Sequence, residues 1–177
     1  MLLRNAIRLE CVCKHAVSIS TETPDPSLLD EQYLNNISLE IIGKYCKEVS
    51  FFSLNHNWRG ICVENNNGGF EYFNSSLSQN PITIGKKGIT VINYNKKFSR
   101  CLLFYNFLDF LNYKTKAVQK KHSHSIDSII LNDPSNLCDF IKHISLYKNV
   151  NCLFPPSSAG KTLTKTIYDI HKNKVDN

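Results

Sequence analysis

The sequence lacks any apolar run long enough to cross a membrane, and it lacks an uninterrupted hydrophobic stretch near its start. A membrane-spanning helix needs roughly 20 consecutive apolar residues, and the longest runs here are far shorter. Arg8 and Glu10 interrupt the apolar residues that open the chain, which argues against a secretory signal peptide. We therefore expect no membrane partner.

The seven cysteines do not fit a disulfide framework, because their number is odd and their spacings are scattered. Cys11, Cys13 and His15 are also too close together to match the paired Cys-x-x-Cys ligands of a zinc ribbon. We interpret most of the cysteines as reduced thiols that occupy small spaces in the core. Reduced thiols are typical of the cytoplasm, so a cytoplasmic location is expected.

Basic residues are scarce in the first half of the chain and abundant in the second. Residues 1–85 contain 6 Lys or Arg and 9 Asp or Glu, whereas residues 86–177 contain 15 and 6. A basic second half fits a polyanionic partner such as DNA or RNA. The alternative is that these lysines keep a helix-rich surface soluble, and charge alone does not decide between the two.

The length of 177 residues favours one domain with a small appendage. Two prolines in the polar stretch 21–27 indicate a linker, so residues 1–27 are expected to form an N-terminal extension that ends in this linker. Residues 28–95 are expected to contain a helical segment and a β-hairpin. Apolar residues recur at helical spacing from Leu28 to Tyr45. Further on, "ENNNGG" separates two β-branched and aromatic runs, a hairpin signal.

Short apolar strands alternate with amphipathic helices from residue 96 to the end. The predicted strands are "SRCLLFY", "SIDSIILN" and "NVNCLF", and each precedes a helical pattern. Asp133 as a cap and Pro134 in the first turn mark the start of the second of these helices. This alternation predicts an α/β fold, a parallel sheet of about three or four strands with helices on its faces.

The predicted carboxyl ends of these strands carry little negative charge, although that is where open α/β sheets bind ligands. The residues that follow the strands are Tyr105 and Asn106, then Asn132 and Asp133, then the stretch 155–158. A protein holds Mg²⁺ with one or two carboxylates. Asp133 is the one acid among these residues, and it is already expected to cap a helix. No metal site is predicted there.

The stretch 153–162, "LFPPSSAGKT", has some features of a phosphate-binding loop. Such a loop requires a glycine five positions before Gly160, where this chain has Pro155. It also usually follows the first strand of its sheet, whereas this stretch follows the last recognisable one. Lys161 remains a candidate phosphate contact, because backbone N–H groups at a helix start favour anions. The alternative for Lys161 is a solvated side chain.

Several fragments, in matching order, resemble the TOPRIM-containing, primase-like proteins of bacterial mobile elements. The resemblance covers roughly residues 29–170. The fragments that carry it are "LEIIGKYCKEV", "RGICVENNNGGFEYFN", "CLLFYNFLDFLNY", "SIILNDPSNL" and "CLFPPSSAGK". The resemblance implies that residues 96–177 form a TOPRIM-like, Rossmann-type domain, and that the chain is associated with DNA.

The chain departs from that family at the residues that would bind metal. The family has a catalytic glutamate and a glycine after its first strand, where this chain has Tyr105 and Asn106. It has an Asp-x-Asp pair before Ala-Gly-Lys, where this chain has Pro155 and Ser157. Family members also continue into another strand beyond the position of Asn177, so the domain is expected to be C-terminally truncated. We expect an inactive descendant with no catalytic residue, no metal and no cofactor.

Nucleic-acid binding is the activity expected to survive. Its candidate residues are Arg59, Lys114, Lys116, Lys120, Lys121 and Lys161. The alternative for the lysines of residues 114–121 is a helix end stabilised by cations, and for Arg59 it is packing at the rim of the core. One alternative is an active primase or nuclease that uses Mg²⁺ and takes its acids from elsewhere, such as Glu64, Asp127 or Asp133. Another is a module that binds or inhibits a protein partner.

Overall fold

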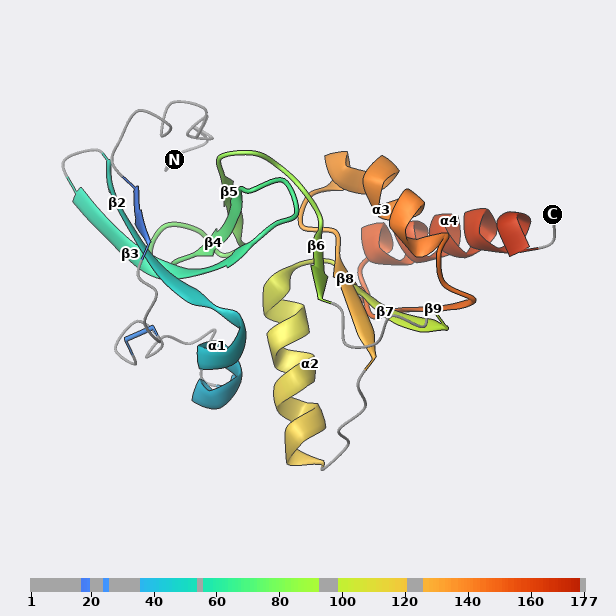
Figure 1. Ribbon diagram of the computed structural model, residues 1–177, viewed down its shortest axis with the longest axis horizontal. Helices are drawn as coiled ribbons and strands as arrows, with labels where there is room; N and C mark the ends of the chain where they lie inside the picture. The colour runs from blue at the N-terminus through green and yellow to red at the C-terminus, as the bar shows by residue number, and fades with distance from the viewer. Residues whose placement is uncertain are drawn as a thin grey trace. The chain divides into compact units, whose positions relative to one another are not determined.

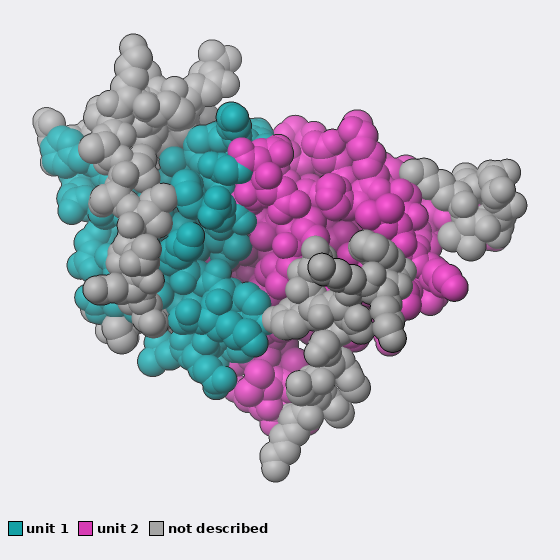
Figure 2. Space-filling model, in the orientation of Figure 1, with its two compact units in different colours: residues 1–64, 68–87 teal, residues 65–67, 88–177 magenta. Residues whose placement is uncertain are grey.

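The computed structural model describes residues 17–19, 24–25, 36–53, 56–92, 99–120 and 126–175. In this part of the chain the protein is mixed α/β, with two sheets and four α-helices. The chain divides into two compact units, coloured separately in Figure 2: residues 1–64 with 68–87, and residues 65–67 with 88–177. None of the helices in the described ranges is both long and apolar enough to span a bilayer.

The first unit is built on a five-stranded antiparallel sheet in which each strand pairs with the next along the chain (Figure 1). Its elements are β1 (Val17–Ile19), α1 (Leu39–Tyr45), β2 (Lys47–Ser53), β3 (His56–Glu64), β4 (Phe70–Phe73) and β5 (Ile82–Ile84). The hairpin predicted around "ENNNGG" is present as β3 and β4, which pair from Ile61–Phe73 to Glu64–Phe70. The pairing of β1, β2 and β5 with this hairpin was not predicted. Strands β1 and β5 have only three residues each, too few for a readable period.

One cluster of core residues in the first unit lies on a single face of this sheet. Apolar residues from four strands pack there: Val49, Phe51, Cys62, Tyr72 and Ile84. The rings of Phe51 and Tyr72 meet edge to face, with centroids 5.2 Å apart, an arrangement worth about 0.5–1.5 kcal/mol beyond the area that it buries. The predicted helical segment is present at its end as α1, while residues 26–35 lie outside the described ranges.

The second unit contains a four-stranded sheet in the order β6-β8-β7-β9. Its strands are β6 (Thr90–Ile92), β7 (Arg100–Phe104), β8 (Asp127–Ile130) and β9 (Asn149–Cys152). The central strand β7 runs parallel to both β8 and β9, which confirms the predicted parallel pairing. The remaining strand, β6, is antiparallel to β8 and lies at one edge.

Asparagine side chains from the β3–β4 turn protect this edge. The backbone N–H of Asn66 donates to the carbonyl of Ile89 (2.8 Å), and its side-chain oxygen accepts from the N–H of Val91 (3.1 Å). Asn66 therefore mimics a further strand and satisfies backbone groups that an open edge would expose. This contact explains why residues 65–67 belong to the second unit.

Helices cover both faces of the second sheet (Figure 1). They are α2 (Phe107–Gln119), α3 (Leu137–Ile144), which follows the short 3₁₀ turn η3 (Pro134–Asn136), and α4 (Ser158–Val175). Alternation along β7 sends Cys101 and Leu103 into a cluster with residues of α3 and α4. Phe104 faces the other way, with its ring centroid 5.5 Å from that of Phe110 in α2.

The strand order creates a switch point at the carboxyl ends of β7 and β9. Since β7 comes first in the chain and lies between β8 and β9, the two crossovers lead to opposite sides of it. In open α/β sheets, ligands bind in the crevice at such a point.

The predicted helix cap after β8 is confirmed, because the Asp133 carboxylate accepts from the N–H of Ser135 (2.8 Å) and Pro134 opens η3.

The tight packing around Gly60 in β3 provides a test of the first sheet. A Cβ atom at this position would overlap the carbonyl oxygen of Phe73 and lie 2.7 Å from the Tyr72 ring. Gly60→Ala should lower the free energy of unfolding by about 1–3 kcal/mol, as overpacked cores do. As the matched control, Gly43→Ala on the exposed side of α1 should raise it by about 0.5–1 kcal/mol. Urea denaturation measures both, and equal stability of the two variants would contradict this packing.

Candidate functional site

Aromatic packing dominates the switch point. Tyr105 follows β7 and Phe154 follows β9, and their rings meet edge to face with centroids 6.3 Å apart. Both rings pack against the core cluster of the second unit. Backbone hydrogen bonds hold the strand ends together, from Leu153 N to Leu103 O (2.8 Å) and from Asn132 N to Tyr105 O (2.9 Å). The residue at the predicted glutamate position therefore belongs to an apolar contact.

Asn106 and Ser157, two further positions where the chain departs from the family that it resembles, stabilise helix starts. The side-chain oxygen of Asn106 accepts from the backbone N–H of Asp109 (3.0 Å) and caps α2. Ser157 does the same for α4, because its Oγ accepts from Gly160 N–H (3.1 Å) and its carbonyl accepts from Lys161 N–H (2.9 Å). Caps of this kind stabilise a helix by about 0.5–2 kcal/mol. Both side chains thus have a local structural task.

The fourth position, Pro155, lies against the first turn of α4. A Cβ atom on Gly160 would overlap the Pro155 carbonyl oxygen, so glycine is needed for this approach. A phosphate-binding loop offers its backbone N–H groups to the ligand. Here the N–H groups of Gly160 and Lys161 already bond to Ser157. The Gly-Lys-Thr triplet therefore reflects close packing of backbone, and this geometry does not support a phosphate loop.

Each acid of the alternative enzyme hypothesis has its own local contacts. Asp127 is buried at the start of β8 and accepts from the Tyr147 hydroxyl (3.0 Å). Asp133 follows the opposite end of the same strand, and Glu64 pairs with Lys47 (3.5 Å) in the first unit. In the described ranges, no group of three or more His, Cys, Asp or Glu side chains could hold a metal ion.

Asp109, in the first turn of α2, is the acid closest in sequence to the strand end at Phe104. Its Oδ2 atom is buried and has no hydrogen-bond partner among the described residues. Burial raises the pKa of this carboxyl group, and the backbone hydrogen bond with Asn106 only partly opposes the shift. A carboxylate in this setting is destabilised when charged.

Asn132, which follows β8, has a left-handed backbone with φ of 64°. Its side-chain nitrogen donates to the Gly88 carbonyl (2.9 Å) and to the Thr90 hydroxyl (3.0 Å), and so ties the β8 end to β6. Asparagine tolerates this backbone region better than most residues. Asn132 therefore has a structural role at the sheet mouth.

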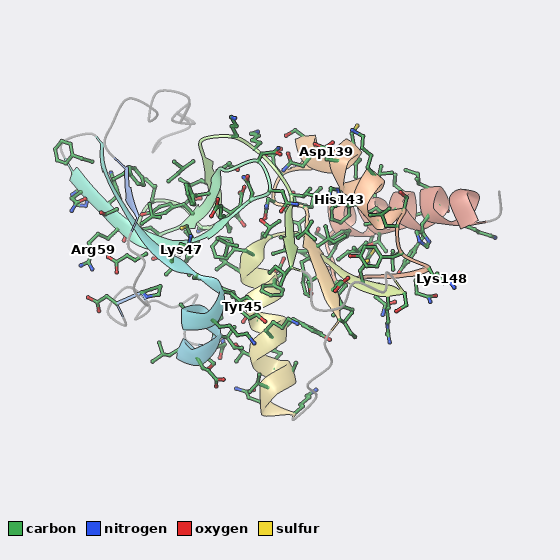
Figure 3. The ribbon with its side chains drawn as sticks, in the orientation of Figure 1. Tyr45, Lys47, Arg59, Asp139, His143 and Lys148 are labelled. Atoms are coloured by element: carbon green, nitrogen blue, oxygen red, sulfur yellow. The ribbon has the colours of Figure 1, made fainter. Side chains whose placement is uncertain are left out.

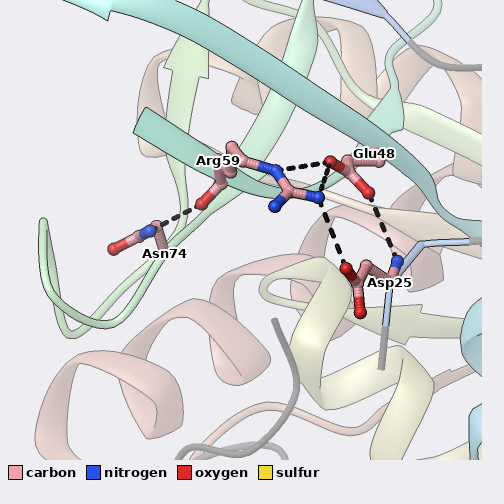
Figure 4. A network of polar contacts seen from close by, with 4 residues as sticks. All are labelled: Asp25, Glu48, Arg59 and Asn74. Atoms are coloured by element: carbon pink, nitrogen blue, oxygen red, sulfur yellow. Dashed lines mark hydrogen bonds and ion pairs between the residues drawn. The ribbon is translucent and has the colours of Figure 1, made fainter. Parts of the chain in front are cut away.

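The predicted nucleic-acid contact Arg59 is engaged within the first unit (Figure 4). Its guanidinium pairs with Glu48 (2.7 Å) and Asp25 (3.6 Å), and the Asn74 side chain donates to its carbonyl (2.6 Å). The hydrogen bond and charge of Glu48 are the main reason why the pKa of Arg59 is raised. Two carboxylates neutralise this cation locally, so it is a weak candidate for a phosphate contact.

The predicted lysines of α2 lie in different surroundings. Lys114 is 9% exposed and holds its ammonium 5.5 Å from the centroid of the Phe110 ring. Lys116 and Lys120 are exposed at the end of α2, and Lys121 lies outside the described residues. Because α2 runs from the carboxyl edge of the sheet back to the amino edge, Lys116 and Lys120 lie far along the unit from Lys161.

A basic face on α4 is the feature that sequence reasoning largely missed. Lys161, Lys165, Tyr168 and Lys172 are all exposed, and their spacing of 4, 3 and 4 residues puts them on one side of the helix. An open groove of about 530 Å³ lies along this face. Its lining includes Phe154, Pro155, Pro156, Lys161, Lys165 and Tyr168. Only Lys161 was singled out from the sequence, although helical spacing in "GKTLTKTIYDIHK" predicts the whole face.

Residues 21–79 match the family model of a domain of unknown function, DUF8464. This match includes α1 and strands β2 to β4 and ends before the second sheet, so it does not reach the α4 groove. No curated protein and no solved structure significantly matches the chain.

Substitutions of Ser157 test whether the carboxyl ends of β7 and β9 have too few acids to bind Mg²⁺. Ser157→Ala should lower the free energy of unfolding by about 1 kcal/mol because the cap of α4 is lost. Ser157→Asp keeps a capping oxygen and introduces one acid, yet should gain no stabilisation from Mg²⁺, because Tyr105 and Pro155 supply no carboxylate. Thermal denaturation with and without Mg²⁺ measures both effects. A melting temperature of Ser157→Asp that rises with Mg²⁺ would overturn this account.

The buried carboxyl of Asp109 should make stability depend on pH. Its pKa is raised on folding, so the folded state holds the proton more tightly, and stability falls as pH rises from about 4 through the raised pKa. Asp109→Asn removes this loss of stability, because an amide does not ionise. It keeps the hydrogen bond that the backbone N–H of residue 109 donates to the Asn106 side chain. Denaturation at several pH values should show a smaller decline in the variant. The control is Asp139→Asn on the exposed face of α3, labelled in Figure 3; identical pH profiles for the two variants would rule the effect out.

Proposed function

We propose that this chain is a nucleic-acid-binding protein descended from TOPRIM-containing, primase-like proteins of mobile elements, without their metal-dependent catalysis. The packing of Tyr105 on Phe154 at the switch point carries the proposal. Divalent cations need carboxylate ligands. The resemblance implies three acids and one glycine at the positions where this chain has Tyr105, Pro155, Ser157 and Asn106, respectively. Each of these residues has a packing or capping contact instead.

The arrangement of the second unit supports a TOPRIM-like, Rossmann-type ancestry. Three parallel strands in the order β8-β7-β9 are covered by helices on both faces. The expected acidic positions, after β7 and after β9, fall at the switch point of this sheet, where such folds bind ligands. Ancestry and lost chemistry are thus proposed for the same place in the fold.

The face of α4 is the proposed contact surface for the nucleic acid. Lys161, Lys165 and Lys172 lie on one side of the helix, in the half of the chain where basic residues outnumber acidic ones 15 to 6. Lysines that contact phosphates displace bound counterions, so the affinity of such a surface depends on salt. Lys116 and Lys120 form a second exposed basic pair at the end of α2.

Binding to a short labelled oligonucleotide, followed by fluorescence anisotropy, tests the proposal. The logarithm of the affinity should fall linearly with the logarithm of the salt concentration. In the double variant Lys161→Ala, Lys165→Ala the slope should decrease by up to about 1.4, since each phosphate contact on a single strand contributes roughly 0.7. The control Lys44→Ala, Lys142→Ala removes the same charge from α1 and α3 and should keep the slope.

Two outcomes would contradict the proposed function. Affinity that does not change with salt would indicate an apolar protein interface, the alternative of an interaction module. Primer synthesis or strand nicking that requires Mg²⁺ and disappears in Asp133→Asn would indicate an active enzyme.

A further inference from the structure

The α4 groove has an apolar wall as well as a basic rim. Phe154, Pro155 and Pro156 line it on the loop side, and Tyr168 lines it from α4. A surface built only to hold a phosphate backbone needs cations and hydrogen-bond donors. Rings of proline, phenylalanine and tyrosine suit a flat apolar partner, which a nucleobase is and a phosphate is not.

The Tyr168 ring is held in place although it is 43% exposed. Its hydroxyl oxygen accepts from the backbone N–H of Cys152 (3.4 Å), on edge strand β9. The helix fixes one end of the side chain and this contact fixes the other. An aromatic surface that is already ordered costs little entropy when it binds a partner.

The charges give the groove a direction. Lys161 and Lys165 are one helical turn apart, so their Cβ atoms are separated by about 5–6 Å and both ammonium groups can reach the same stretch of backbone. Asp169 lies next to Tyr168 in the lining and would repel a phosphate there. A neutral base tolerates that neighbour. The phosphate is therefore favoured at the two lysines and the base at Tyr168.

We infer that the α4 groove binds single-stranded nucleic acid, with one base stacked on Tyr168 and the adjoining phosphate at Lys161 and Lys165. This inference rests on the proposed function and names its substrate class. In a duplex the base faces are covered by their neighbours, so the apolar wall would have nothing to contact. A groove of about 530 Å³ falls in the size range of pockets that hold small ligands.

Variants of Tyr168 test this inference against an unstructured strand, oligothymidine, and against the same strand paired with oligoadenosine. Tyr168→Ala should weaken binding of oligothymidine by about 5- to 150-fold, the range found when a stacked aromatic is removed. Tyr168→Phe loses the contact with Cys152 but keeps the ring, so its affinity should stay within about threefold of the parent. The salt slope should be unchanged in both, because neither variant removes a phosphate contact.

Oligouridine provides the comparison with RNA. Because stacking depends on the base, Tyr168→Ala should bind more weakly than Tyr168→Phe to both DNA and RNA. Equal affinity for single strand and duplex, together with equal binding by Tyr168→Ala and Tyr168→Phe, would overturn the single-strand inference. The proposed function would survive that result if binding still fell with salt. A failure of both single strand and duplex to bind would refute the two together.

Discussion

The edge-to-face contact between Tyr105 and Phe154 limits which ligands the carboxyl ends of β7 and β9 can bind. The two rings belong to the same core cluster as residues of α3 and α4, so they help to close the second unit. A carboxylate at either position would lose hydration against the neighbouring ring, at a cost of several kcal/mol unless a cation or donor compensated it. Apolar packing and a metal-binding mouth are therefore competing uses of one place, and this chain has the packing.

The neighbouring positions are also occupied by structural contacts. Asn106 and Ser157 direct their side-chain oxygens to the first turns of α2 and α4, and Pro155 brings its carbonyl against Gly160. The side chains that could contact a ligand are Lys161, Lys165 and Tyr168, on the exposed side of α4. The binding that we propose for this surface of lysines and an ordered tyrosine uses charge and stacking, which need no metal.

The sequence predicted the parallel strands and their helices well, because strands buried on both faces leave continuous apolar runs. The three-residue strands β1 and β5 could not be assigned from the sequence, since so short a segment has no readable period. The role of Asn66 as an edge partner depends on a contact 25 residues away along the chain. No local pattern predicts such a contact.

The surroundings of the cationic residues also depend partly on local helix geometry and partly on contacts distant in the sequence. We predicted Lys114 as a nucleic-acid contact, although its helical spacing from Phe110, four residues before it, already indicates the buried face. The same spacing puts Lys165 on the face of Lys161, which we did not use in the prediction. The pairing of Arg59 with Asp25 joins residues far apart in the chain, so its neutralisation became visible only in the structure. The α4 groove was partly predictable, whereas its apolar wall depends on how the loop after β9 folds back.

The central claim is that the switch point carries too little negative charge to bind a divalent cation. Titration of the folded protein with Mn²⁺, followed by paramagnetic broadening of the NMR signals of Tyr105, Asn106 and Ser157, tests it most directly. The account predicts no saturable broadening of these three residues. Saturable broadening centred between the ends of β7 and β9 would contradict it.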